Sequence, residues 1–411
     1  MPATATPVKT ASQRFLADQG VQRALACLDE QWANHPRVVS DVRDAAGRQY
    51  VDLVLEGGGV LGIALVGYTY ALERVGIRFL HLGGTSAGAI HALVLAAAGT
   101  KDEAKSEAVL DVLAETSLES FLDGDRRARS LTHALAGGAG TWRLGWHAFR
   151  ARNTLREHLG LHPGVVFTEW LESTLAGFDV RTLADLEARL CASPEGLDAR
   201  EAGCRLGIVS AEIRTETKVV FPEMAELFWD DPASVSPAHF VRASMSIPGF
   251  FWPFRVGSIP DGEAATVAWS HHAGYRGTLP TECLFVDGGI LSNFPIDLFH
   301  VRGVPSAPTL GAKLDLDRTA PREIGGVPAY LGAILDAARN NLDYDFIRRN
   351  PDYSQLVTAI PTTPHHWLNF SLDWEAKIDL FRRGVEAATD FLAQFDWEGY
   401  KNLRAQAIEL T

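Results

Sequence analysis

The chain lacks the features that define several broad classes of protein. Its longest apolar run, residues 89–98, is far shorter than the roughly 20 residues that a membrane-spanning helix needs. Its four cysteines, Cys27, Cys191, Cys204 and Cys283, include no Cys-x-x-Cys pair, which argues against a zinc site or a redox motif. We therefore expect buried free thiols, no metal site and a reducing compartment.

Positive charge is also scarce. The 411 residues include 38 Lys and Arg against 51 Asp and Glu, a formal net charge of −13. This balance excludes a broad nucleic-acid surface, which needs clustered basic residues, although a local apolar patch can still dock on lipid. Residues 1–7 show no apolar stretch behind a basic cluster, so no signal peptide is predicted. We expect a cytoplasmic protein, with export by a route that needs no cleavable signal left open.

What the chain does have is ample material for a core. Hydrophobic residues make up 46% of it, and no Ser/Gly-rich or Pro-rich linker divides it. We predict a helical N-terminal extension over 1–49, a main domain over 50–395 and a C-terminal tail over 396–411. The extension contains helical apolar spacing at 11–35. The main domain carries a helical insertion at about 101–200.

Strand and helix patterns alternate at the start of the main domain. Strands are predicted at 51–55 and 77–82, and helices at 62–75 and 87–98. This alternation predicts a parallel sheet with right-handed crossovers. Further along, the patterns predict two strands within 205–221, a short helix at 238–246, a loop over 255–281, a strand at 283–286 and an amphipathic helix near 373–395.

A glycine loop, residues 56–62, follows the first strand directly. It places backbone N–H groups at a helix N-terminus, where negative charge is favoured. Gly57, Gly59 and Gly62 formally satisfy a dinucleotide fingerprint, but the acidic residue expected about 20 positions on is replaced by a serine turn. We therefore discount NAD binding. We assign Gly57, Gly58 and Gly59 to an oxyanion hole, with the N–H groups of Gly58 and Gly59 as its natural donors.

A second glycine-rich turn, Gly84-Thr85-Ser86-Ala87-Gly88, follows the second strand. The Gly-x-Ser-x-Gly pattern alone is weak evidence, but here it lies between a predicted strand and a predicted helix. The alternative is that Ser86 caps the helix, a role that would need no glycine on either side. The context predicts Ser86 as a nucleophile, with Gly84 and Gly88 supporting the sharp turn.

A serine nucleophile needs a base, and none of the 13 histidines lies at a strand end with glycine support. Asp287-Gly288-Gly289 does end an apolar strand, and its glycines allow a sharp turn. A carboxylate there can accept the Ser86 proton directly and form a Ser-Asp dyad. The alternative is an aspartate that only caps a turn, and this motif alone does not decide between them.

The three motifs stand in the order and contexts found in the patatin-like phospholipases. The chain also resembles this family at 242–254, a segment that supports the active site in the family, and at 291–295, 369–372 and 384–388. The resemblance covers roughly residues 50–395. It implies a three-layer α/β/α fold with a mostly parallel central sheet. It also implies a Ser86–Asp287 dyad that hydrolyses acyl esters of phospholipids, lysophospholipids or neutral lipids, with no cofactor and no calcium in the chemistry.

One departure from the family bears on activity. Leu61 stands where many members have Lys or Arg, and Glu56 stands where some have Asp. Two alternatives therefore stay open beside hydrolysis: a lipid acyltransferase on the same scaffold, and a lipid-binding protein with an impaired site. The sequence does not choose a head group, an acyl position or a protein partner.

Two groups of aromatic residues are candidates for contact with a membrane or micelle surface. Core packing is the favoured interpretation of both, and lipid contact is the alternative. The first group lies in the helical insertion and could form a lid or lipid-facing cap, and the second lies in the 242–254 segment: Trp142, Trp146 and Phe149; Phe250, Phe251, Trp252 and Phe254.

Overall fold

The structure is a computed structural model that describes residues 10–136, 141–197, 205–314 and 346–409, with isolated positions between 321 and 337. Its strands are β1 (Gln49–Leu55), β2 (Ile77–Thr85), β3 (Gly160–His162), β4 (Leu206–Glu212), β5 (Thr217–Phe221), β6 (Gly249–Phe251), β7 (Phe254–Gly257), β8 (Glu282–Asp287), β9 (Thr309–Leu314) and β10 (Val357–Ile360).

The described helices cover most of the remaining chain. The α-helices are α1 (Ala11–Leu16), α2 (Gln19–Asn34), α3 (Ile63–Arg74), α4 (Ala87–Ala97), α5 (Ser106–Glu115), α6 (Arg126–Ala136), α7 (Thr141–His158), α8 (Val165–Gly177), α9 (Leu183–Leu190), α10 (Ala238–Ser244), α11 (Gly262–Ala273), α13 (Trp374–Gln394) and α14 (Trp397–Glu409). The short 3-10 helices are η1 (Gly59–Gly62), η2 (Leu118–Phe121), η3 (Ala225–Leu227), η4 (Pro232–Ser234), η5 (Gly288–Ile290) and η6 (Pro351–Gln355).

The central sheet is mixed and mostly parallel, as expected. Its strand order is β10-β9-β1-β2-β4-β8-β7, and β5 also pairs with β4. Neighbouring strands from β10 to β4 run parallel, whereas β8 and β5 pair antiparallel with β4, and β7 pairs antiparallel with β8. Strand β4 therefore joins the parallel part of the sheet to the antiparallel part.

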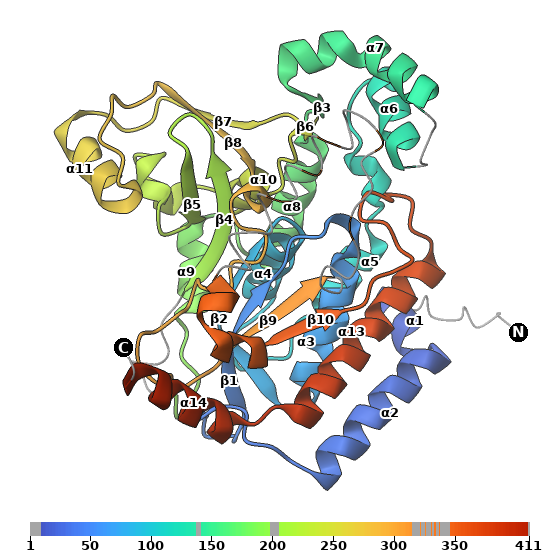
Figure 1. The fold of residues 1–411 in the computed structure, drawn as a ribbon, viewed down its shortest axis with the longest axis vertical. Helices are drawn as coiled ribbons and strands as arrows, with labels where there is room; N and C mark the ends of the chain where they lie inside the picture. Colours follow the sequence, from blue (N-terminus) through green and yellow to red (C-terminus); the bar gives the residue numbers. More distant parts are fainter. Residues whose placement is uncertain are drawn as a thin grey trace, which may run out of the picture.

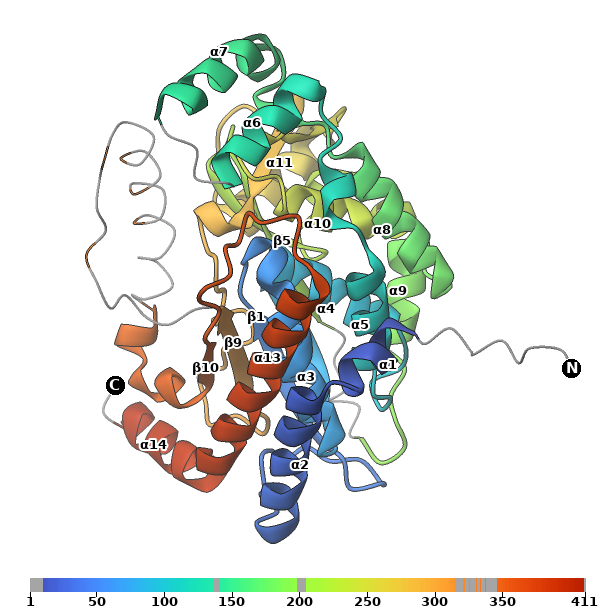
Figure 2. The same ribbon diagram turned by 90° about the vertical axis from the view of Figure 1, so that its right-hand side faces the viewer.

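Helices enclose the sheet from two sides. Strand β1 is buried along its whole length, which explains why its run of Val and Leu side chains is nearly continuous. Helix α3 connects β1 to β2 and α4 follows β2, so right-handed crossovers place both on the same face of the sheet. In Figure 2, α2 and α3 lie on one side of the strands labelled β9 and β10, and α14 lies on the other. The layers are those of a three-layer α/β/α fold (Figure 1).

Several predicted boundaries were wrong for identifiable reasons. Strand β2 continues to Thr85 rather than ending at residue 82, because Gly83 and Gly84 pair with β4. The predicted loop at 255–281 contains helix α11, which follows Asp261 and ends at Gly274 with a φ of +64°.

The single helix expected at 11–35 is broken into α1 and α2. The break occurs where the Asp18 side chain accepts hydrogen bonds from the N–H groups of Gly20 and Val21 and so starts a new helix. Residues 1–9, expected to be disordered, lie outside the described residues.

The expectation of buried free thiols was only partly right. Cys283 is free and buried, whereas Cys27 is free but exposed, and Cys191 is disulfide-bonded. Cys204 lies outside the described residues. Cysteine spacing alone did not distinguish these environments.

The two ends of the chain pack on the main domain through helices. Helix α2 contacts α13, and the ring of Phe15 meets the rings of Trp374 and Phe381 edge-on. The segment predicted as a C-terminal tail contains α14, in which Trp397 and Tyr400 are buried. The division into extension, main domain and tail stays a prediction.

Helices α3 and α13 approach each other through two glycines. A Cβ atom at Gly384 would lie 1.9 Å from the carbonyl oxygen of Ala64, and one at Gly67 would lie 1.9 Å from the carbonyl oxygen of Phe381. Both contacts are with backbone, which cannot move aside as a side chain can. The close packing of α13 on the helix between β1 and β2 therefore depends on these two positions.

We predict that Gly384→Ala lowers the free energy of unfolding by about 1–3 kcal/mol, because the new methyl group overpacks the contact. Helix propensity alone would raise stability by up to about 1 kcal/mol. The matched control is Gly177→Ala at the end of α8, where a Cβ would meet nothing within 4 Å. Urea denaturation measures both variants, and a Gly384→Ala protein as stable as the control would contradict the packing argument.

Candidate active site

Ser86 lies at the sharp junction between β2 and α4. Its φ is 52° and its ψ is −116°, a backbone conformation that residues other than glycine rarely adopt. Although Ser86 holds the N-cap position of α4, its side chain makes no capping hydrogen bond. The residue is 7% exposed, so its hydroxyl sits in a largely enclosed environment.

Close backbone packing explains the glycines on each side of this serine. A Cβ atom at Gly88 would lie 2.1 Å from the carbonyl oxygen of Leu55, at the end of β1. One at Gly84 would lie 2.6 Å from the carbonyl carbon of Gly88. Only glycine at both positions lets α4 begin against the end of β1, and this contact holds the turn that carries Ser86.

Asp287 ends β8, which lies on the same edge of β4 as β2, because β5 pairs along the opposite edge of β4 beside both strands. Asp287 pairs with Ser210 of β4, and Thr85, just before the serine, pairs with the adjacent Val209. Strands β2 and β8 therefore meet end to end along one edge of β4, and no strand lies between their last residues, Thr85 and Asp287. Asp287 is 8% exposed. Serine and aspartate thus reach the same point beside β4 from two strands that run towards each other.

The glycines after Asp287 hold its turn tightly. The Gly289 N–H donates to Oδ1 of Asp287 at 2.7 Å. A Cβ atom at Gly288 would lie 2.1 Å from the carbonyl oxygen of Val209. The turn therefore orients the carboxyl group and also packs directly on β4.

The glycine loop lies against the serine. A Cβ atom at Gly57 would lie 3.2 Å from Cβ of Ser86. The Gly57 N–H already donates to the carbonyl oxygen of Asn293 at 3.0 Å. Within the described parts of the chain, the N–H groups of Gly58 and Gly59 donate to no protein acceptor. The loop beside Ser86 thus has two backbone donors that make no hydrogen bond with the described residues.

A buried carboxylate, whose sequence position indicated only a variation within the family, connects this loop to the aspartate segment. Glu56 accepts a hydrogen bond from Nδ2 of Asn293 at 3.0 Å and from the Leu314 N–H at 2.6 Å. Nδ2 of Asn293 also donates to the Gly57 carbonyl oxygen at 3.1 Å. This role of Glu56 could have been predicted from its position directly after a buried apolar strand, because a buried carboxylate needs hydrogen-bond donors.

The segment at 242–254 supports both Ser86 and Asp287. Oγ of Ser244, at the end of α10, accepts a hydrogen bond from the Ser86 N–H at 2.9 Å and donates to the Val209 carbonyl oxygen at 2.6 Å. The carbonyl oxygen of Ser246 accepts from the Asp287 N–H at 2.8 Å. One short stretch of chain thus fixes the backbones of serine and aspartate.

Arg242 anchors this stretch to the helical region. Its guanidinium donates to Oγ of Ser246, to the carbonyl oxygen of Pro163 at 2.7 Å and to that of Trp252 at 2.9 Å. Burial lowers the pKa of Arg242 to about 10, so the group still carries its charge at neutral pH. These charge-assisted hydrogen bonds connect the residues around Ser244 to the chain that follows α7.

A two-stranded sheet, β3 with β6, makes a second connection. Nδ1 of His162 on β3 accepts the Gly124 N–H at 3.0 Å, so its protonated Nε2 donates to Oγ of Thr132 in α6 at 2.8 Å. Burial lowers the pKa of His162 to about 4. The neutral ring therefore connects α6 to the segment that supports the candidate active site.

This histidine should make the protein acid-sensitive. An unfolded histidine binds a proton near pH 6.5, whereas folded His162 resists protonation down to about pH 4. Its contribution to stability is complete above pH 6.5 and is lost as the pH falls towards 4. We predict that the unfolding free energy of His162→Gln falls less steeply over this range, by up to about 1 kcal/mol per pH unit. Parallel slopes for the two proteins would contradict this assignment.

The structure separates the two aromatic groups. Phe250 and Phe251 are buried, so core packing is correct for them, and the ring of Trp252 stacks on that of His158 with centroids 3.7 Å apart. Trp146 and Phe149 are 60% and 58% exposed, so the core interpretation was wrong for these two. The half-buried Phe254 packs against the core. The side chain of Trp142 and the glycines at 137–140 lie outside the described residues.

Leu61 lies in η1 beside the glycine loop. It is 6% exposed and belongs to the hydrophobic core, together with Val60 and Ile63. The leucine is thus accommodated by packing at a position where many family members carry a positive charge.

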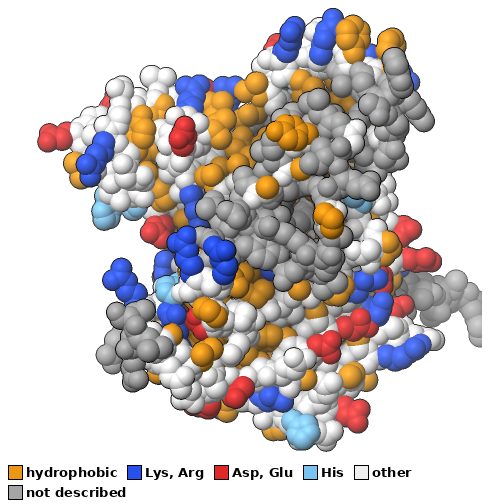
Figure 3. Space-filling model, viewed as in Figure 1, with side chains coloured by type: hydrophobic (Ala, Val, Ile, Leu, Met, Phe, Trp, Pro, Cys, Tyr) orange, Lys and Arg blue, Asp and Glu red, His pale blue; other side chains and the backbone are white. Residues whose placement is uncertain are grey.

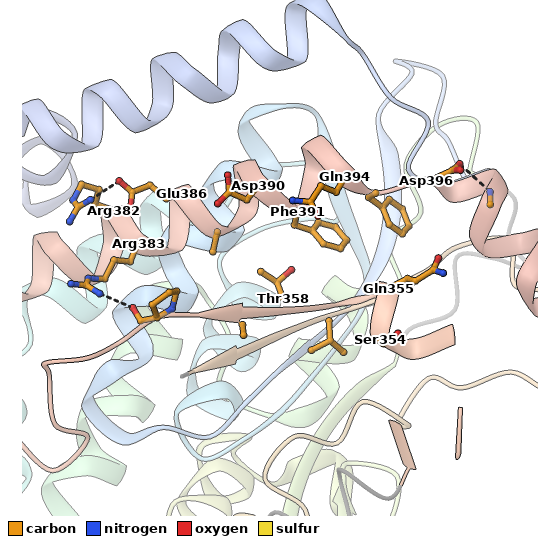
Figure 4. A pocket seen from close by; sticks show the side chains of 16 residues that line it. Ser354, Gln355, Thr358, Arg382, Arg383, Glu386, Asp390, Phe391, Gln394 and Asp396 are labelled. Carbon is orange, nitrogen blue, oxygen red and sulfur yellow. Dashed lines mark hydrogen bonds and ion pairs between the residues drawn. The ribbon is translucent and has the colours of Figure 1, made fainter. Parts of the chain in front are cut away.

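A cavity of about 950 Å³ lies elsewhere, between β10, α13 and the start of α14. Figure 4 shows Arg382 paired with Glu386 and Arg383 donating to the Pro361 carbonyl oxygen along its wall. None of the predicted site residues lines this cavity. Within the described residues, no helix is long and apolar enough to cross a membrane, and no group of His, Cys, Asp and Glu side chains is arranged to hold a metal ion.

We predict that Ser244→Ala lowers the free energy of unfolding by about 1–3 kcal/mol, because the buried Ser86 N–H loses its acceptor. The control is Ser236→Ala, just before α10, whose hydroxyl makes no hydrogen bond with the described residues. Chemical denaturation compares the two variants, and equal stability would show that Ser244 does not fix the serine turn.

The chain is similar to several known proteins and solved structures. A protein of Bacillus subtilis, YqhO, whose own function is uncharacterized, is 28% identical over 350 residues, which are 85% of this chain and all of YqhO. The crystal structure of VipD from Legionella pneumophila is 16% identical with a TM-score of 0.44, covering 87% of this chain and 70% of VipD. ExoU of Pseudomonas aeruginosa, in complex with SpcU, is 17% identical with a TM-score of 0.34, covering 85% of this chain and 53% of ExoU.

The sequence model of one family matches well over half of the chain. The match spans residues 53–300 and so includes the glycine loop, the serine turn and the aspartate turn in a single alignment. The earlier resemblance, drawn from the motifs alone, is thereby confirmed at the level of the family. This chain belongs to the patatin-like phospholipase family.

Proposed function

We propose that the protein is a serine hydrolase of lipid acyl esters, with Ser86 as nucleophile and Asp287 as general base. The observation that carries the proposal is the meeting of three parts at β4. These are a serine in a strained strand-to-helix turn, an aspartate at the end of the strand that meets β2 along the same edge of β4, and a loop with two N–H groups that donate to no described acceptor. Family membership supports the same assignment.

In the first half of the reaction, Oγ of Ser86 attacks the ester carbonyl carbon while Asp287 takes the hydroxyl proton. The leaving alcohol then receives that proton, and the acyl group stays on Ser86. In the second half, Asp287 takes a proton from water, which attacks the acyl-enzyme and releases the fatty acid. Ser86 regains its proton, so the two residues return to their starting state.

The negative charge that develops on the carbonyl oxygen needs fixed donors. The N–H groups of Gly58 and Gly59 fit this role, because they are open among the described residues and their loop lies against Ser86. Such donors are each worth about 3 kcal/mol of barrier in acyl transfer. Gly57 holds the loop in place through Asn293 rather than serving as a free donor.

The second candidate, acyl transfer to another alcohol, uses the same serine and differs only in the acceptor of the second step. The third, an impaired lipid-binding protein, rested on Leu61. That residue is packed in the core, which gives no reason to expect loss of the nucleophile or base. We therefore favour hydrolysis, and product analysis with an added alcohol distinguishes transfer, since a transferase forms new ester in preference to free acid.

The test is hydrolysis of a p-nitrophenyl ester series of increasing chain length, in EDTA, by the parent and two variants. We predict that Ser86→Ala and Asp287→Asn each lose at least about a thousandfold in kcat, because each removes a group that acts in every turnover. Activity should rise with acyl length and persist in EDTA, because the proposed chemistry uses only protein groups.

Matched controls are Ser236→Ala and Asp261→Asn, neither of which makes a side-chain hydrogen bond with the described residues. Both should keep parental activity. Retained activity in Ser86→Ala or Asp287→Asn would contradict the dyad, and a folded parent without activity on any ester would contradict hydrolysis.

A further inference from the structure

Positive charge is concentrated in one part of this acidic protein. Residues 125–158, which include α6 and α7, contain seven arginines and only two acidic residues, whereas the whole chain has a net charge of −13. Lys and Arg side chains gather with hydrophobic ones at the end of the molecule formed by α7 (Figure 3).

The two helices form a basic pocket between them. It has a volume of about 380 Å³ and is lined by Arg126, Arg127 and Ser130 of α6 and by His147 and Arg150 of α7. None of these three arginines forms an ion pair with any described residue. The pocket thus holds unneutralised positive charge, with no carboxylate in its lining.

The acidic residue nearest in sequence is already engaged. Oδ1 of Asp125 accepts the N–H groups of Arg127 and Ala128 and so caps the first turn of α6. Its charge serves the helix N-terminus rather than the arginine side chains.

An exposed aromatic pair lies beside this pocket. The rings of Trp146 and Phe149 stack with centroids 6.4 Å apart, and the guanidinium of Arg152 lies 4.0 Å from the centre of the Phe149 ring. Residues three and four apart share a helix face, so Trp146, Phe149 and Arg150 present apolar and basic groups together. Large aromatic side chains exposed next to arginines are typical of segments that enter the lipid interface.

This surface lies at the same end of the molecule as the candidate active site. Helices α6 and α7 lie beyond the carboxyl ends of β1 and β2 in Figure 1, and beyond β1 in Figure 2. The β3–β6 pairing and the hydrogen bonds of His162 connect them to the segment that supports Ser86 and Asp287.

We propose that the α6–α7 surface, defined by Arg126, Arg127, Trp146, Phe149 and Arg150, docks the protein on anionic phospholipid bilayers. The arginines bind head-group phosphates, and the two aromatic rings enter the boundary between head groups and acyl chains. Because the rest of the protein is acidic, an anionic bilayer repels it and attracts this end, which turns the active-site end towards the lipid. The inference rests on the proposed function only for the identity of the lipid as substrate.

The experiment measures binding rather than turnover. Ser86→Ala protein is sedimented with phosphatidylcholine vesicles that contain or lack phosphatidylglycerol. We expect much tighter binding with phosphatidylglycerol, and loss of that preference in about 1 M NaCl, where screening acts over about 3 Å. Because the protein is inert by design, failure to bind counts against docking alone, and failure to hydrolyse esters counts against the proposed function alone.

The variants separate charge from aromatic contact. Arg126→Ala with Arg150→Ala should weaken binding to phosphatidylglycerol vesicles roughly 25-fold, about fivefold for each arginine. Trp146→Ala with Phe149→Ala should weaken the binding that persists in high salt. The control variants are Val267→Ala on α11 and Arg276→Ala just after it, both at exposed positions. Each control should bind the vesicles as tightly as the parent does. Thermal unfolding confirms that each variant is folded.

A second readout locates the contact. Subtracting the emission of Trp146→Phe from that of the parent isolates the fluorescence of Trp146, which should shift to shorter wavelength on phosphatidylglycerol vesicles. Binding without preference for anionic lipid, equal losses in the controls, or an unshifted Trp146 signal in the bound protein would each overturn the proposal. Binding of polyanionic RNA in place of vesicles would also overturn it.

Discussion

The close contact between the start of α4 and the end of β1 is the constraint on which the candidate site depends. The carbonyl oxygen of Leu55 occupies the space that a side chain on Gly88 would need, so the helix can begin there only with glycine. The chain then reaches Ser86 at a positive φ, and the serine stands at the turn rather than within the helix. The Gly57–Ser86 contact, the Ser244 hydrogen bond and the pairing of β2 with β4 all act on this one turn.

Buried polar groups then hold three separate stretches of chain in register. Glu56 joins the glycine loop to Asn293 and Leu314, and Ser244 and Ser246 fix the backbones of the serine and the aspartate. Each group is costly to bury unless all of its partners are present. These hydrogen bonds satisfy one another and together fix the candidate site, including the backbones of Ser86 and Asp287, within the fold. Helices α6 and α7 are attached to it and are more exposed.

The features that could be predicted from the sequence are those determined by neighbouring residues. The alternation of strand and helix patterns predicted β1, α3, β2 and α4. The glycines predicted the tight turns at residues 57, 86 and 287, because a position that lacks a side chain can be recognised in the sequence. Pairings between distant segments were not predictable: β3 and β6 are three residues each, and the role of Ser244 depends on a backbone 158 positions away. Helix α11 was missed because its histidines and flanking glycines outweighed its run of good helix formers, and the exposure of Trp146 depends on tertiary packing that no periodicity reveals.

The most direct test of the central claim, that Ser86 is an activated nucleophile, is covalent labelling with a fluorophosphonate followed by mass mapping of the peptides. The account predicts one adduct, on the peptide that contains Ser86, formed slowly in Asp287→Asn and absent from Ser86→Ala. An adduct on another residue, or a folded protein that takes no label, would contradict it.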